Sequence, residues 1–151
     1  MSDNAFCRIG SYNLRCPCDP PPYDWTSRAP RVIANLHAIK YDIFGVQEAV
    51  DTQIATILQN TRYQSIGVGR DAHLAGEYSC IFYDPARFTN IGQNTFWLSS
   101  TPEVPASKSW NTACPRICTY GTFLDKLTGR IFVFANTHLD HVSPQAQLNG
   151  I

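Results

Sequence analysis

The sequence predicts an α/β domain in which a mixed, mainly antiparallel sheet is flanked by helices. Two segments in the first sixty residues carry apolar residues at helical spacing, whereas short runs rich in β-branched and aromatic residues dominate the rest of the chain. A turn-forming segment, residues 125–129, joins the last two runs and indicates a β-hairpin. Because no internal repeat, low-complexity segment or linker interrupts the pattern, we expect residues 1–151 to belong to one domain.

The first predicted elements are a strand, a loop and a helix. Residues 6–13 are typical of a strand, and the four prolines within residues 16–23 require a loop. Residues 29–40 place apolar side chains three and four positions apart, which predicts an amphipathic helix. Ser27 is the expected N-cap of this helix, with Pro30 in its first turn.

The later elements are one more helix and six strands. Residues 42–47 form a short apolar run typical of a buried strand, and residues 51–60 repeat isoleucine and leucine at helical spacing. Five further strands are predicted at residues 63–68, 78–83, 94–98, 117–123 and 130–136. Helices early in the chain and strands later in it are the layout of an α/β sandwich.

The charge balance excludes one class of behaviour. Twelve basic and twelve acidic residues give a formal net charge of zero, so no global field draws the chain to nucleic acid or to an anionic membrane. Zero net charge does not exclude a local basic site. The N-terminus has neither the basic nor the apolar part of an export signal, and no stretch reaches the length of a transmembrane segment. We therefore expect a cytoplasmic protein.

The six cysteines are expected to be reduced thiols, because nothing in the sequence directs the chain to an oxidising compartment. Cys7 and Cys80 fall in predicted strands and are interpreted as small core side chains. The pairs at positions 16/18 and 114/118 lack the two-residue gap of a structural zinc pair, which disfavours a zinc site.

Polar side chains follow three of the predicted strands. Asn13 and Arg15 follow the first, Glu48 follows the second, and residues 136–141 hold four polar groups able to bind metal or phosphate. Strands of one sheet end along one edge, so these groups are expected close together. Glu48 is either a ligand for a hard cation such as Mg²⁺ or an N-terminal charge for the helix near residue 51. His138 is either a structural side chain with all its hydrogen bonds made within the fold or a catalytic residue.

The ordered series of these residues carries a family resemblance. It consists of Asn13-x-Arg15, Gln47-Glu48, Gly76-Glu77-Tyr78, Phe96-Trp97-Leu98-Ser99, Pro115-Arg116-Ile117 and Asn136-Thr137-His138-Leu139-Asp140-His141. The series resembles the endonuclease/exonuclease/phosphatase superfamily, whose DNase I-like fold is a four-layer α/β sandwich. This superfamily includes nucleases, deadenylases, neutral sphingomyelinases and inositol-phosphate phosphatases.

The resemblance implies a role for each matching residue. Glu48 matches the carboxylate that binds a divalent metal, Mg²⁺ with Mn²⁺ as the alternative, and Asn13 matches the residue that orients that carboxylate and approaches the phosphate. His138 matches the histidine that contacts the scissile phosphate. Glu77 matches the acid that pairs with this histidine, which would raise the histidine pKa. Arg116 matches a phosphate-contacting arginine.

Other residues are second-rank candidates. Asp140 and His141 either line the site or only stabilise the loop. Arg15 either reaches phosphate or pairs with a carboxylate, and the sequence leaves both open. Trp97 and Trp110 could offer a stacking surface, but burial is the favoured explanation for both.

Two motifs of the resembling family, Gly-Asp-x-Asn and Ser-Asp-His, do not occur in the chain. Residues 1–151 are therefore expected to be the N-terminal portion of an incomplete family domain, supplying mainly one of its two sheets. One apolar sheet face would then meet water, which costs about 25 cal/mol per Å² and makes a partner chain that supplies the missing half a candidate.

The function implied by the resemblance is a Mg²⁺-dependent phosphoric-ester hydrolase, in which metal-activated water attacks phosphorus in line. The phosphate-ester substrate is unresolved between nucleic acid, phospholipid headgroup and nucleotide. The alternative is a catalytically inactive truncated remnant that binds at most metal, phosphate or a protein partner.

Overall fold

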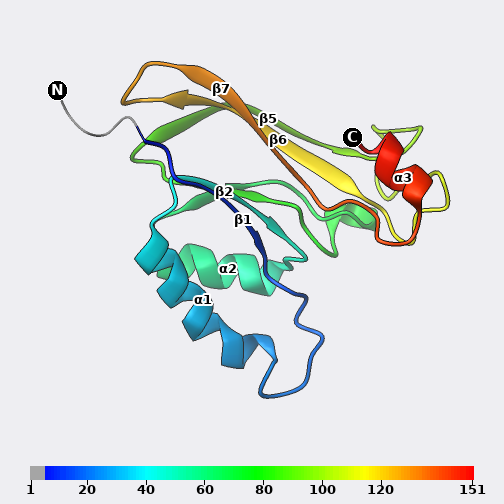
Figure 1. Cartoon of the computed structure of the whole chain (residues 1–151), viewed down its shortest axis with the longest axis horizontal. Helices are drawn as coiled ribbons and strands as arrows, with labels where there is room; N and C mark the ends of the chain where they lie inside the picture. Colours follow the sequence, from blue (N-terminus) through cyan, green and yellow to red (C-terminus); the bar gives the residue numbers. More distant parts are fainter. Residues whose placement is uncertain (1–5) are drawn as a thin grey trace.

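The computed structural model describes residues 6–151, which form two stacked β-sheets with helices on one side (Figure 1). In chain order the elements are β1 (Ile9–Asn13), α1 (Trp25–Ile39), β2 (Ile43–Gln47), α2 (Asp51–Asn60), β3 (Gln64–Ile66), the 3-10 turn η1 (Ala72–Leu74), β4 (Ile81–Tyr83), β5 (Phe88–Trp97), β6 (Ile117–Asp125), β7 (Ile131–Thr137) and α3 (Pro144–Asn149). Residues 1–5, on which part of the expectation of no export signal rests, lie outside the described residues.

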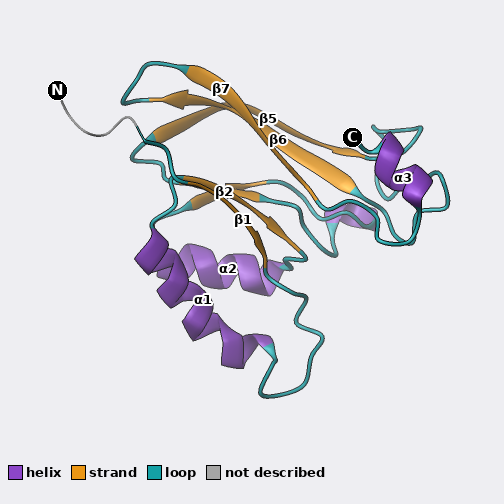
Figure 2. Ribbon diagram, viewed as in Figure 1, coloured by secondary structure: helices purple, strands orange, loops and turns teal. Residues whose placement is uncertain are grey.

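The first sheet has four strands in the order β1-β2-β4-β3, and it is mixed. β1 runs parallel to β2, whereas β4 runs antiparallel to both β2 and β3. Every residue of β2 is buried, because helices cover one face of this strand and the second sheet covers the other (Figure 2). The parallel pairing places Asn13 opposite Gln47 at the same edge.

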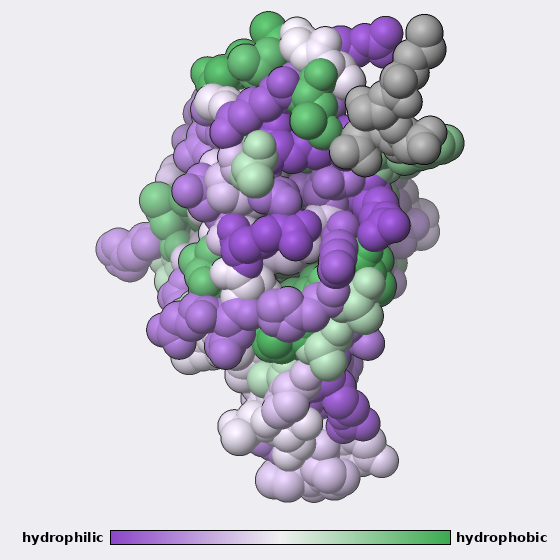
Figure 3. Space-filling model, turned by 90° about the vertical axis from the view of Figure 1, so that its left-hand side faces the viewer, coloured by the Kyte–Doolittle hydropathy of each residue, from purple (hydrophilic) through white to green (hydrophobic). Residues whose placement is uncertain are grey.

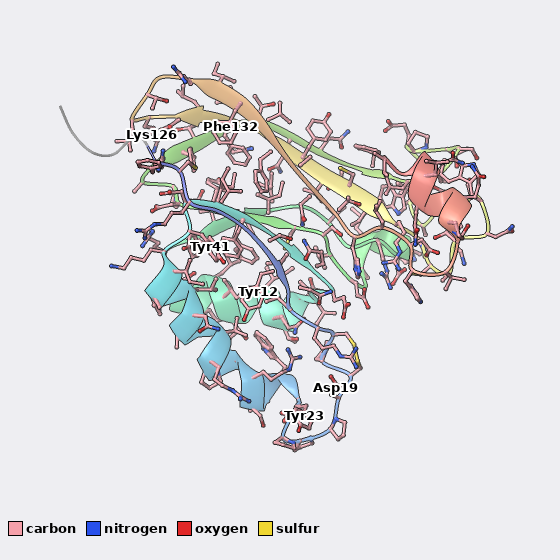
Figure 4. All side chains as sticks on the ribbon, in the orientation of Figure 1. Tyr12, Asp19, Tyr23, Tyr41, Lys126 and Phe132 are labelled. Atoms are coloured by element: carbon pink, nitrogen blue, oxygen red, sulfur yellow. A yellow bond between two sulfur atoms is a disulfide. The ribbon has the colours of Figure 1, made fainter. Side chains whose placement is uncertain are left out.

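The second sheet is antiparallel, in the order β5-β6-β7, and β6 and β7 form the predicted hairpin. Its inner face carries aromatic residues that pack against the first sheet; Phe132 lies between the two layers in Figure 4. Phe123 stacks on Phe132 at 5.7 Å between ring centroids. This aromatic layer forms one core of the molecule.

The second core lies between the first sheet and helices α1 and α2. Leu36 and Ile57 from the two helices contact Phe44 and Phe82 of the sheet within one buried cluster. The predicted start of the first helix is wrong: α1 begins four residues earlier, and its N-cap is Asp24, whose side chain accepts from the Ser27 N–H. Capping by Asp24 extends the helix toward its N-terminus, and Pro30 consequently lies inside it.

Three further expectations need correction. The chain supplies strands to both sheets, not mainly to one, because β5, β6 and β7 form a sheet of their own. Cys7 precedes β1 and is exposed, so it is not a core side chain. Cys16 and Cys18 are joined by a disulfide bond, although all six cysteines were expected to be reduced. Cys80 is buried, as predicted.

The outer face of the second sheet carries no helix among the described residues (Figure 1). Ile131 and Val133 are each 63% exposed there, and Ile91 of β5 is 52% exposed. This apolar surface is not the one expected, because the face of the first sheet that would meet water without a second sheet is covered by β5, β6 and β7. Within residues 6–151, no helix has the length and apolarity that crossing a membrane would require.

Candidate active site

The predicted site residues meet at one end of the sandwich, where β1 and β2 end and β6 begins. β7 also ends there, because Thr137 pairs with Cys118 at the start of β6. Asn136 joins the two sheets at this point: its amide nitrogen donates to the carbonyls of Val46 and Cys80 at 2.8 and 2.9 Å, and its amide oxygen accepts from Gln47 at 2.7 Å. Asn136 is therefore a structural link rather than a ligand for metal or phosphate.

Glu48 is held as the resemblance implies. Its Oε1 accepts a hydrogen bond from Asn13 Nδ2 at 2.8 Å, and its Oε2 accepts from the Cys16 N–H at 3.1 Å. Burial raises the pKa of Glu48, but these two hydrogen bonds outweigh it and lower the pKa below its ordinary value. The carboxylate is therefore ionised at neutral pH, as a metal ligand must be.

The backbone of Glu48 adopts a left-handed conformation, with φ of 59°. A residue other than glycine or asparagine in this region carries strain of about 1–3 kcal/mol, and such strain concentrates at functional sites. The strained turn directs the chain out of β2 and places the Glu48 carboxylate beside β1. Both hydrogen bonds of the Glu48 carboxylate go to Asn13 and Cys16, and its binding of a cation stays a prediction.

His138 follows β7 directly and is partly buried, but its electrostatics differ from the prediction. Burial and the positive charge of Arg116 lower its pKa, against smaller opposing effects of Glu48 and Glu77. The expected rise of the histidine pKa is therefore wrong, and the imidazole is neutral at pH 7. Its Nδ1 atom is buried and has no hydrogen-bond partner among the described residues.

Glu77 does not pair with His138 as expected. Its Oε2 accepts from Arg70 Nη1 in an ion pair of 2.7 Å. The Arg70 N–H also donates to the Glu77 carbonyl at 3.0 Å, so the two residues face each other across the loop between β3 and β4. Local backbone pairing therefore places a guanidinium closer to the carboxylate than the histidine is.

Arg70 also lines the site, although no sequence motif indicated it. Its side chain is 16% exposed, and its Nε atom is buried without a hydrogen-bond partner in the described part of the chain. The sequence feature that could have indicated Arg70 is the glycine-rich loop in which it lies. Gly67 and Gly76, on either side of Arg70, have φ of 123° and 80°. Such a loop folds back tightly and can turn a polar side chain inward.

Arg116 is almost fully buried and is fixed by two residues of the loop after β7. Its Nε donates to Asp140 Oδ2 at 3.4 Å, and its Nη2 contacts His141 Nδ1 at 2.9 Å. A guanidinium can only donate hydrogen bonds, so His141 Nδ1 is the acceptor and the proton of a neutral His141 sits on Nε2. Asp140 and His141 therefore support Arg116 rather than stand alone in the site.

Asp140 organises this loop through several hydrogen bonds. Its carboxylate accepts from Thr112 Oγ1 at 2.8 Å and from the N–H groups of Ala113, Val142 and Ser143 at 3.1, 3.0 and 2.8 Å. Burial alone would raise the pKa of Asp140, but the hydrogen bonds lower it far below its ordinary value. The side chain is ionised throughout the neutral range.

Arg15 and the two tryptophans have structural contacts. Arg15 forms an ion pair of 2.9 Å with Asp19. Of the two roles that the sequence left open for Arg15, the structure therefore shows the pairing with a carboxylate. Trp97 is buried, as favoured, and its Nε1 donates to the Arg70 carbonyl at 2.7 Å. Trp110 is partly exposed.

One small cavity collects the predicted groups. It is lined by Glu48, Arg70, Glu77, Tyr78, Ser79, Arg116, Ile117 and His138. Asn13 joins the site through its hydrogen bond to Glu48, whereas Arg15 points to Asp19. A larger cavity, of about 810 Å³, lies at the opposite end of the sandwich. The surface at that end is mostly hydrophilic (Figure 3). No predicted site residue lines that larger cavity.

The donor set at the small cavity fits a hard cation held mainly by water and substrate. Residues 6–151 contain no group of three or more His, Cys, Asp or Glu side chains arranged to hold a metal ion. Glu48 supplies one ionised carboxylate with its orientation fixed by Asn13. Mg²⁺ is commonly bound through one or two carboxylates, several waters and substrate phosphate. The single carboxylate of Glu48 is compatible with this coordination.

No family model and no curated protein matches the chain. Solved structures do. An endonuclease/exonuclease/phosphatase from Bacteroides vulgatus is 36% identical, with a TM-score of 0.89 over 95% of this chain and 56% of that one. A mannosyl-6-phosphatase of Bacteroides thetaiotaomicron is 37% identical, with a TM-score of 0.90 over 96% of this chain and 56% of that one.

A second protein of Bacteroides thetaiotaomicron, described as an endonuclease/exonuclease/phosphatase family protein, is 38% identical, with a TM-score of 0.91 over 95% of this chain and 54% of that one. The chain thus spans a little over half the length of these relatives. The fold, the ordered residues around Glu48 and His138, and this level of identity agree, and the chain belongs to the endonuclease/exonuclease/phosphatase family.

Proposed function

We propose that the protein carrying this chain is a Mg²⁺-dependent phosphoric-ester hydrolase in which water attacks phosphorus in line. The observation that carries the proposal is the small cavity, where an ionised carboxylate, a buried arginine and a neutral histidine converge from β2, β6 and β7. Membership of a family that contains phosphatases supports the same reaction class.

Each residue has a distinct task in this proposal. Glu48, oriented by Asn13, would hold Mg²⁺. A bound divalent cation polarises a phosphate oxygen and offsets the charge that grows during attack. Arg116, fixed by Asp140, offers its remaining guanidinium donors to the phosphate oxygens. His138 is neutral and can donate a hydrogen bond to the phosphate from one ring nitrogen.

A phosphate monoester is the substrate class to test first. One relative of 37% identity is described as a mannosyl-6-phosphatase, and that name supports a sugar phosphate for the present protein. The zero net charge of the chain gives no general attraction for duplex nucleic acid. Mannose 6-phosphate is therefore the first assay substrate, with bis(p-nitrophenyl) phosphate as the diester for comparison.

The variant Glu48→Gln tests the proposal in the full-length native protein. Removing the charged ligand forfeits several kcal/mol of charge stabilisation, so Mg²⁺-dependent turnover should fall on the order of a thousandfold. Calorimetric titration with Mg²⁺ should show a matching loss of affinity. Glu103→Gln, at an exposed glutamate away from the cavity, is the matched control and should retain both properties.

Two outcomes would contradict the proposal. Full turnover by Glu48→Gln would remove the metal assignment. Failure of the unmodified protein to hydrolyse any phosphate ester, while it still binds Mg²⁺ or phosphate, would instead support the inactive binding protein that the sequence also allows.

A further inference from the structure

The two donors that hold the Glu48 carboxylate come from one turn of the chain after β1. Asn13 Nδ2 donates to Oε1 at 2.8 Å, and the Cys16 N–H donates to Oε2 at 3.1 Å. Between these donors lies Arg15, whose φ of 59° is left-handed. A residue with a Cβ atom keeps such a conformation only where the surrounding structure holds it. The turn therefore needs contacts that fix it.

The backbone of Arg15 is linked to both oxygens of the carboxylate. Its N–H donates to Asn13 Oδ1 at 2.8 Å, which turns Asn13 Nδ2 toward Glu48. Its carbonyl belongs to the same peptide group as the Cys16 N–H. Because a trans peptide is planar, with its C=O and N–H pointing in opposite directions, contacts that fix the Arg15 carbonyl also aim the Cys16 N–H.

Two helices hold the Arg15 carbonyl. Arg28 of α1 donates to it from Nη2 at 3.0 Å, and Gln53 of α2 donates to it from Nε2 at 2.9 Å. Gln53 is fully buried, and its Oε1 accepts from the Val50 N–H at 3.1 Å. The amide of Gln53 is therefore fixed at both ends, with its nitrogen toward the turn.

Arg28 also holds the neighbouring carbonyls of the turn. Nη1 donates to the Leu14 carbonyl, Nη2 donates to the Cys16 carbonyl at 3.2 Å, and Nε donates to the Tyr23 carbonyl at 2.7 Å. All three guanidinium nitrogens thus donate to the main chain. A guanidinium carries five donors in fixed directions, which suits it to bind several successive carbonyls at once.

We propose that Arg28 and Gln53 are positioning residues for Glu48: by holding the Arg15 carbonyl they aim the Cys16 N–H and so orient the carboxylate. Neither residue belongs to the sequence motifs that resemble the family. The consequence for metal binding rests on the proposed function, whereas the orientation of Glu48 is a property of the metal-free chain.

The first test measures hydrogen exchange of the Cys16 amide by NMR in the metal-free native protein. Arg28→Lys keeps the charge but replaces the guanidinium fork by one ammonium, which cannot bind the same set of carbonyls. The protection of the Cys16 N–H should fall about tenfold relative to that of the Val46 N–H, which donates to a carbonyl within the first sheet. Arg31→Lys, at an exposed arginine of α1, is the matched control and should leave this ratio unchanged.

Equal loss of protection at the two amides in Arg28→Lys would show general destabilisation and would overturn the positioning role. Gln53→Met removes the donor from α2 alone, so it decides the matter if Arg28→Lys does not fold. It should lower the relative protection of the Cys16 N–H by a smaller factor, because Arg28 still holds the Arg15 carbonyl. Full relative protection in Gln53→Met would contradict the role of Gln53.

A pair of substitutions at Arg15 tests the turn without changing either helix. Arg15→Gly is compatible with the left-handed conformation and should keep the protection of the Cys16 amide, although the guanidinium is removed. Arg15→Val places a branched Cβ in that conformation and should lose the protection. The same protection factor in both variants would contradict the proposal.

Calorimetric titration with Mg²⁺ measures the consequence for the metal. Arg28→Lys should weaken Mg²⁺ affinity on the order of tenfold, the lower end of the effect of groups that orient a ligand, while Arg31→Lys should not. Unchanged affinity despite lost Cys16 protection would overturn the role in metal binding and leave the proposed hydrolase intact. Failure of the unmodified protein to bind Mg²⁺ would contradict the proposed function, and the exchange measurements would still decide whether Arg28 orients Glu48.

Discussion

At the scale of single residues, the site contains a buried ion pair between Arg116 and Asp140. Arg116 is buried at 5% exposure beside Asp140 at 3%, and this pair lies between the second sheet and the loop that follows β7. A buried ion pair adds little net stability when it is complete, but breaking it leaves an uncompensated charge. The substitution of either partner should therefore be costly.

Asp140→Asn should destabilise the folded protein by about 3 kcal/mol at pH 7, because Arg116 would keep its charge without its carboxylate partner. Urea unfolding at constant temperature measures this. Asp19→Asn is a suitable control, since Arg15, its ion-pair partner, is 59% exposed and keeps contact with water. A loss no larger than in that control would show that Arg116 has another partner.

The same residue gives a pH prediction. Because the pKa of Asp140 is lower in the folded chain than in the unfolded one, its stabilising effect is present above about pH 4 and is lost as the pH falls further. The unfolding free energy of the native protein should decrease over this acidic range. The decrease should be shallower in Asp140→Asn, and equal slopes for the two proteins would contradict the assignment.

At the scale of elements, β7 is positioned by one buried amide. Asn136 makes hydrogen bonds to three residues of the first sheet, and the absence of a side chain at Gly45 is what lets it approach: a Cβ atom there would clash with Asn136. Since His138 follows two residues later, the same contact determines where the histidine lies relative to Glu48.

Asn136→Ala should lower the unfolding free energy by about 3 kcal/mol, because the carbonyls of Val46 and Cys80 would lose a donor while they stay buried. Turnover should fall as well, since the end of β7 would no longer be held against β2. Thermal and urea unfolding measure the first effect. Asn94→Ala, at an exposed position of β5, should change stability by less than about 0.5 kcal/mol.

At the scale of the whole molecule, the two faces of the second sheet differ in environment. The inner face packs Phe123 and Phe132 against the first sheet, whereas the outer face leaves Ile131 and Val133 in contact with solvent within the described residues. Exposed β-branched residues on a sheet favour association between molecules. A partner chain for this protein stays a prediction of the sequence.

Replacing Ile131 and Val133 together by threonine should reduce self-association without a large loss of stability, because both side chains are already 63% exposed. Sedimentation velocity over a range of concentrations measures the association. Phe132→Thr, at the intervening inward position, should instead destabilise the fold by roughly 3 kcal/mol. Unchanged association in the double variant would show that this face does not drive contact between molecules.

Local patterns in the sequence account for much of this architecture. Helical spacing identified α1 and α2, the turn after Asp125 identified the β6–β7 hairpin, and the parallel pairing of β1 with β2 explains why Asn13 and Glu48 could be placed together. Strand ends were less accurate. β5 begins at Phe88 rather than at residue 94, because pairing with β6 extends a segment whose own residues are mixed in polarity.

What the sequence determined by itself was therefore the order of the strands and of the first two helices and the polar residues at the strand ends, since each depends on the spacing and identity of residues close in the chain. The ordered series of motifs along the whole chain indicated the family. The short helix α3 was not predicted. Only the tertiary structure decided which charges pair. Glu77 meets Arg70 instead of His138, and Asn136 bridges two sheets instead of binding a ligand. Those choices depend on distances between elements, which packing sets and which local patterns do not contain.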